Sequence, residues 1–192
     1  MKAFIAALIV AGVFSASPVN AATKTAKSKA PVTRAAPALT SKTDKQLSAI
    51  PVRGAWKHIV IHHTATASAT ARGIDRFHRE KRHMENGMAY HFLIGNGRGM
   101  GDGEIYIGNR WKKQIQGGHL ASEQLNMSSI GICLVGNFEE KGPTARQMES
   151  LEALLRKLIQ QTGLSRSALT THRSIHPRHT SCPGRHFALP KL

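Results

Sequence analysis

Two groups of histidines and a cysteine, far apart along the chain, have the side chains that hold a metal ion. His62 and His63 are neighbours, and a histidine-rich segment runs from His172 to Cys182 much later in the sequence. Imidazole nitrogen and thiolate sulfur are ligands that Zn²⁺ prefers, and three protein ligands with one open position are typical of a catalytic site. The chain has only two cysteines, which excludes a closed framework of paired cysteine ligands. A fold must therefore bring these residues together.

The segments around these residues predict an α/β domain with a single mixed β-sheet flanked by helices. The run 130–135 is the most apolar and is expected at the centre of the sheet, and residues 95–103 predict a glycine-rich hairpin loop. Helices are predicted at 71–82 and 144–163, the second with Thr144 and Gln147 as a capping box. Strands are predicted at 56–62, 90–94, 104–107, 130–135 and 169–171, the last of which delivers His172.

The N-terminal part of the chain predicts export and a tether. Residues 1–21 have a positive start, an apolar run and small residues before a cut after Ala21, which is the layout of a signal peptide. The apolar run is shorter than the roughly 20 residues of a membrane-spanning helix. We therefore expect a periplasmic or secreted protein, with an uncleaved membrane anchor as the alternative. Residues 22–52 predict a flexible basic linker, which leaves 53–192 as the folded domain.

The net charge of +16 predicts attraction to a polyanion. Export favours anionic polymers of the cell envelope over nucleic acid. Only 5% of the residues are aromatic, so the stacking surfaces of single-strand binders are scarce and no specific nucleic-acid partner is expected. The sequence contains no dimerisation signal, and a monomer is expected.

Five motifs in order resemble those of the zinc-dependent N-acetylmuramoyl-L-alanine amidases, a group shared with phage endolysins and peptidoglycan recognition proteins. They are VIHHTAT at 60–66, AYHFLI at 89–94, GGH at 117–119, NMSSIGICLVG at 126–136, and the segment from His172 to Cys182. The match extends from Trp56 to Phe187. The resemblance implies an enzyme that uses zinc-activated water to cleave peptidoglycan, at the amide between the muramic acid lactyl group and L-alanine of the stem peptide.

The resemblance also implies roles for individual residues. Tyr90 is expected beside the metal, where a phenol could donate to the developing oxyanion or position the water. Thr180, two residues before the cysteine, is expected next to the metal, and His119 and Asn126 are expected to contact substrate in a groove. The metal ligands that it implies are His62, His172 and Cys182.

Two alternatives remain open from the sequence. The nine residues between His172 and Cys182 are a longer gap than the family usually has, so His176 or His179 could replace His172 as a ligand. The protein could also be a non-catalytic peptidoglycan-binding module, but such members of the family typically lack the cysteine, and Cys182 is present. The sequence specifies neither the stem-peptide preference nor the biological role.

Overall fold

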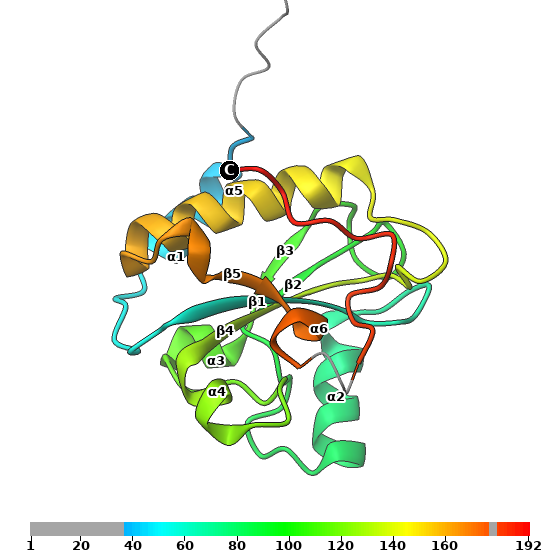
Figure 1. Ribbon diagram of the computed structural model, residues 1–192, viewed down its shortest axis with the longest axis horizontal. Coiled ribbons are helices and arrows are strands. Elements are labelled where there is room, and N and C mark those ends of the chain that lie inside the picture. Colours follow the sequence, from blue (N-terminus) through cyan, green and yellow to red (C-terminus); the bar gives the residue numbers. More distant parts are fainter. Residues whose placement is uncertain (1–36, 177–179) are drawn as a thin grey trace, which may run out of the picture. The chain divides into compact units, whose positions relative to one another are not determined.

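The computed structural model describes residues 37–176 and 180–192, with a five-stranded sheet at its centre (Figure 1). The predicted signal peptide, the first part of the predicted linker and His179 lie outside the described residues. No helix of the described residues is long and apolar enough to cross a membrane.

The sheet is mixed, as predicted, with the strand order β3-β2-β4-β1-β5. β1, β2, β4 and β5 are parallel, and β3 is antiparallel to β2 because a hairpin loop joins the two. The most apolar strand, β4, lies at the centre, which confirms the prediction. The strands are β1 (His58–His63), β2 (Phe92–Ile94), β3 (Ile105–Ile107), β4 (Ser129–Leu134) and β5 (Leu169–Thr171).

The two faces of the sheet differ in character because side chains alternate along each strand. Large apolar residues, among them Ile59, Ile61, Ile130 and Ile132, belong to one core cluster together with the buried leucines of α5 (Ala145–Thr162). Their neighbours along the strands on the other face include small and polar residues such as Gly131, Cys133 and His62. We call this second side the site face. It carries the smaller cluster that includes residues of α2 (Ala71–Arg82).

The helices lie on both sides of the sheet, with α5 on one side and α2 on the other (Figure 1). In α5 the predicted capping box forms, since Thr144 and Gln147 exchange side chain to backbone hydrogen bonds, and Gly163 ends the helix with a φ of 71°. Beyond residue 100, three short α-helices were not predicted from the sequence, because each lacks a full period of the apolar pattern. They are α3 (Asn109–Lys113), α4 (Glu123–Ser128) and α6 (His172–Ile175).

The predicted linker is wrong for its last part, because α1 (Ser41–Ser48) is a helix within the fold. Leu47 is fully buried in the core cluster of α5, and Leu39, Ile50 and Val52 pack against the same cluster. Lys157 of α5 forms an ion pair with Asp44 at 2.8 Å. Composition did not indicate this helix, because a few apolar residues at suitable positions are enough to dock a short segment on a neighbour.

Candidate metal centre and active site

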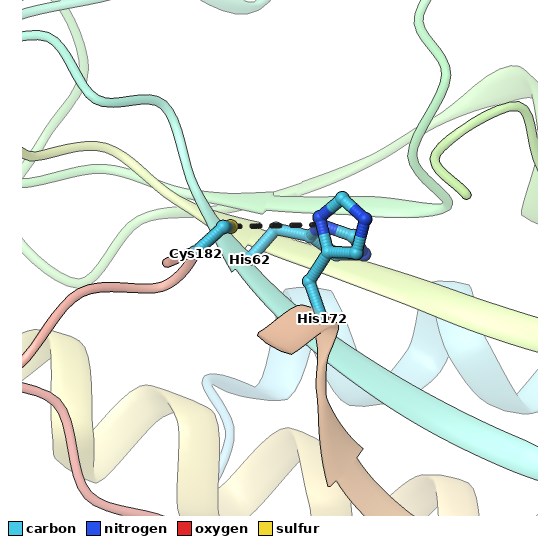
Figure 2. Close-up of side chains that lie close together, drawn as sticks. All are labelled: His62, His172 and Cys182. Carbon is cyan, nitrogen blue, oxygen red and sulfur yellow. Dashed lines mark hydrogen bonds between the residues drawn. The ribbon is translucent and has the colours of Figure 1, made fainter. Parts of the chain in front are cut away.

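The fold brings His62, His172 and Cys182 together at the carboxyl ends of two parallel strands. In the register of β1 and β5, Ile61 pairs with Thr171, so the next residues, His62 and His172, emerge side by side. Cys182, which follows α6 in the chain, lies beside His62 (Figure 2). The candidate ligand atoms of the three residues all lie within 4.8 Å of one another. Strand register therefore brings together residues that are far apart in the sequence.

Alternation along β1 separates His62 from His63. His62 lies on the site face, where its Nδ1 is 3.8 Å from Sγ of Cys182. His63 points to the other face, where its Nδ1 accepts a hydrogen bond from the backbone N–H of Phe138 at 3.0 Å. The backbone N–H of His63 still donates to Sγ of Cys182 at 3.4 Å. The strand therefore presents one imidazole and one amide N–H to the cysteine.

Backbone contacts hold Cys182 in place. Its N–H donates to Oγ1 of Thr180 at 3.0 Å, and its carbonyl accepts from the N–H of Arg173 at 2.7 Å. Burial raises the pKa of the Cys182 thiol to about 11, while the His63 N–H and the charge of Arg173 oppose the shift. Thr180 thus has a place in the turn that carries the cysteine. Its predicted catalytic role stays a prediction.

Both histidines of the cluster are neutral at pH 7. Burial lowers the pKa of His62 well below its usual value, and the neighbouring His119, His172 and His63 lower it further. Burial, followed by His176 and His63, lowers the pKa of His172 to about 4. A neutral imidazole keeps a lone pair for a metal. Two such nitrogens and one sulfur form a donor set that fits Zn²⁺ with one position left open.

Tyr90 lies beside this cluster, with its ring centroid 5.2 Å from that of His62. Burial raises the pKa of the Tyr90 phenol well above its usual value, and the Cys133 and Cys182 thiols add to the shift. The hydroxyl is therefore protonated at neutral pH and can donate a hydrogen bond. A cavity of about 420 Å³ extends from Tyr90 between α2 and the loop after β1, and Ile74 and Phe77 form part of its lining.

His119 and Asn126 occupy the interior next to the cluster. Nδ1 of His119 is 3.0 Å from Nε2 of His62. The side-chain oxygen of Asn126 accepts from the backbone N–H groups of His119 and Leu120, each at 3.0 Å. Both side chains are buried and are bonded to the protein itself. The contact of His119 and Asn126 with substrate stays a prediction. The hydrogen bond between the His62 and His119 rings was not predicted from the sequence.

His91 is fully buried in the same region, although no motif in the sequence indicated a role for it. Its Nδ1 accepts from the N–H of Gly131 at 3.0 Å, and its Nε2 bonds the carbonyl of Ile115 at 3.1 Å. Among the described residues, His176 is not part of the donor cluster, although its ring lies 6.1 Å from that of His172. The other alternative ligand, His179, lies outside the described residues.

Comparison with known proteins agrees with the fold. The family described as N-acetylmuramoyl-L-alanine amidase (Amidase_2) matches residues 52–185. A peptidoglycan-recognition protein of Drosophila simulans is 33% identical over 147 residues, which cover 72% of this chain and 71% of that protein.

Two solved structures have a similar fold. The endolysin N-acetylmuramoyl-L-alanine amidase LysCS of Clostridium intestinale is 34% identical, with a TM-score of 0.60 over 70% of this chain and 78% of that one. Peptidoglycan recognition protein LE, in complex with tracheal cytotoxin, is 30% identical, with a TM-score of 0.56 over 73% and 86% of the two chains. This chain therefore belongs to the type 2 N-acetylmuramoyl-L-alanine amidase family, which also includes the peptidoglycan-recognition proteins.

Proposed function

We propose that this protein is a zinc-dependent N-acetylmuramoyl-L-alanine amidase, which hydrolyses the amide between the muramic acid lactyl group and L-alanine of the stem peptide. The observation that carries the proposal is the cluster of His62, His172 and Cys182, whose candidate ligand atoms lie within 4.8 Å of one another. Two nitrogens and one sulfur match a catalytic zinc site rather than a closed structural one.

In this proposal the three residues hold Zn²⁺ through a lone pair on each imidazole and through the sulfur of Cys182. When bound, zinc polarises the carbonyl of the scissile amide and supplies a nucleophile at neutral pH by lowering the pKa of a water to about 7. Cys182 gives up its proton when it binds the metal, because only the thiolate is a ligand. The N–H of His63, 3.4 Å from Sγ, stabilises the resulting charge on sulfur.

Tyr90 acts on the substrate in this proposal. Its phenol is protonated at neutral pH because burial raises its pKa, and its ring is 5.2 Å from that of His62. It can therefore donate a hydrogen bond to the carbonyl oxygen as negative charge develops there. The cavity beside Tyr90 is the proposed position of the stem peptide. Recognition protein LE, a relative with this fold, was solved with a monomeric peptidoglycan of the diaminopimelic acid type.

The second candidate function is recognition of peptidoglycan without catalysis. It is supported by the relatives that are recognition proteins, such as the one from Drosophila simulans. The complete set of donors, with Cys182 in place, favours the enzyme. In either case we propose that the protein is exported. Its net charge of +16 would then attract it to anionic polymers of the cell envelope.

The test is release of stem peptide from purified peptidoglycan, measured as new L-alanine amino termini. We expect release by the wild-type protein, loss of release with a chelator or in Cys182→Ala, and recovery when zinc is added back to the chelated wild type. Binding of the protein to peptidoglycan without release under any of these conditions would instead identify a recognition module.

Single histidine variants test which imidazoles belong to the site. His172→Ala should abolish release, whereas the matched variants His176→Ala and His179→Ala should retain it. Loss of release in either matched variant, with His172→Ala active, would show that the long gap before Cys182 supplies a different ligand.

A further inference from the structure

We propose that His119 is a positioning residue: it fixes, through a hydrogen bond between two imidazole rings, which nitrogen of His62 faces the metal. The inference deepens the proposed function and rests on it only in taking His62 as a ligand. Neither the family resemblance nor the sequence pattern indicated this contact, since His119 was expected to touch substrate.

The donors and acceptors around His119 follow from the carbonyl of Ser129, which can only accept a hydrogen bond. Nε2 of His119 is 3.3 Å from the backbone carbonyl of Ser129, so this nitrogen carries a proton. Within the described part of the chain, the ring's hydrogen-bond partners are this carbonyl and an imidazole, with no carboxylate to stabilise a charged ring. In a neutral His119, Nδ1 is then the acceptor.

The tautomer of His119 fixes the tautomer of His62. Nδ1 of His119 lies 3.0 Å from Nε2 of His62, so Nε2 of His62 must be the donor. The lone pair of His62 is therefore on Nδ1, the nitrogen that lies 3.8 Å from Sγ of Cys182. The chain His62, His119 and the Ser129 carbonyl thus selects the one tautomer that can bind a metal on the side of the cysteine.

The surroundings of the His119 ring are shaped to hold it in this orientation. A Cβ atom on Gly131 would lie 2.4 Å from Cδ2 of His119, and a Cβ atom on Gly117 would lie equally close. Any other residue at these two positions would displace the ring. Asn126 also holds the backbone of His119 and Leu120, with both its amide oxygen and its amide nitrogen. Two glycines and one amide therefore define a slot for this imidazole.

In metal sites, a ligand histidine usually has a hydrogen-bond partner on the ring nitrogen that does not bind the metal. Partners of this kind orient the ligand ring, and their removal typically weakens metal binding by about 10- to 100-fold. In most sites the partner is a carboxylate, a carbonyl or water. Here it is a neutral imidazole, which orients His62 without adding negative charge behind it.

The first test needs no variant and no activity. In the metal-free wild-type protein, ¹⁵N NMR of the histidine side chains reports which ring nitrogens carry protons. We expect the proton of His62 on Nε2, with Nδ1 unprotonated, and the proton of His119 also on Nε2. A proton on Nδ1 of His62 would overturn the proposal.

The second test compares two replacements of His119 by their affinity for Zn²⁺, measured in competition with a chromophoric chelator. His119→Leu fills a similar volume but accepts no hydrogen bond, and we expect zinc affinity to fall by about 10- to 100-fold. His119→Asn places an amide oxygen on the same side-chain carbon that bears Nδ1, and it should recover most of the affinity. His186→Leu is the control for loss of an exposed histidine and should bind zinc as the wild type does.

The outcomes separate this proposal from the proposed function. Unchanged zinc affinity in a folded His119→Leu protein would overturn it, as would equal losses in His119→Leu and His119→Asn. If the leucine variant does not fold, the NMR result on the wild type decides. A protein that binds zinc with the expected tautomer but releases no stem peptide would refute the amidase and leave the role of His119 intact.

Discussion

Leu47→Ala should lower the stability of the protein without changing the chemistry of its site. Leu47 is fully buried, in one cluster with the leucines of α5, although its helix lies in a segment whose composition predicts a linker. Truncating a buried leucine to alanine costs about 2–5 kcal/mol of unfolding free energy. The ion pair of Asp44 in α1 with Lys157 is partly exposed to solvent and contributes about 1 kcal/mol, so the leucine dominates the docking of this helix.

The expected change is large enough to measure by thermal unfolding. For a domain of this size each kcal/mol shifts the melting temperature by about 2–4 °C, so Leu47→Ala should melt about 4–20 °C below the wild type. Leu189→Ala is the matched control, because that leucine is 37% exposed and its loss should change stability by no more than about 0.5 kcal/mol. Circular dichroism on the full chain follows both variants.

The same variant separates stability from catalysis. Leu47 packs on the face of the sheet opposite His62, so the folded fraction of Leu47→Ala should release stem peptide at the wild-type rate at low temperature. Equal melting temperatures for Leu47→Ala and Leu189→Ala would refute this reasoning. The linker would then extend to residue 52, as composition alone predicts.

Three further predictions concern the site and its surroundings. Burial lowers the pKa of His91 to about 3, so between that value and the 6.5 of an unfolded histidine the unfolded state binds the extra proton. The free energy of unfolding should therefore fall as the pH drops through this range, by up to about 5 kcal/mol. Denaturant titrations at several pH values should show a shallower dependence of this free energy on pH in His91→Asn than in the wild type. An equal dependence in the two proteins would contradict the assignment. Burial raises the pKa of the Cys182 thiol to about 11, so zinc affinity should increase with pH and binding should release a proton, both measurable by calorimetry in buffers of different ionisation enthalpy. A pH-independent affinity would exclude thiolate ligation. Tyr90→Phe should lower the rate of stem-peptide release by about 100- to 1,000-fold with zinc affinity unchanged, and a variant as fast as the wild type would remove Tyr90 from the mechanism.

Local patterns in the sequence predicted those parts of the fold that depend on near neighbours. The apolar run of β4, the periodic face of α5 and the capping residues Thr144 and Gln147 act within a few positions of the chain, and the structure confirms all three. The resemblance implied His62 as the ligand, and adjacent residues on a strand point to opposite faces, so His63 is then expected to face away from the metal. The structure agrees, with His62 in the donor cluster and His63 bonded to Phe138.

The sequence by itself determined the residue types of the site, the family and the mixed sheet, because motifs and periodicity are written in the order of the residues. The resemblance implied which residues form the ligand set, but only the tertiary structure shows how they meet and which other side chains join them. His62 reaches His172 through the register of β1 and β5, and it reaches His119 through a slot between two glycines from different segments. Leu47 is buried because α5 offers it a surface, not because its own segment is apolar. Contacts between distant segments depend on packing and register, and no local pattern encodes either.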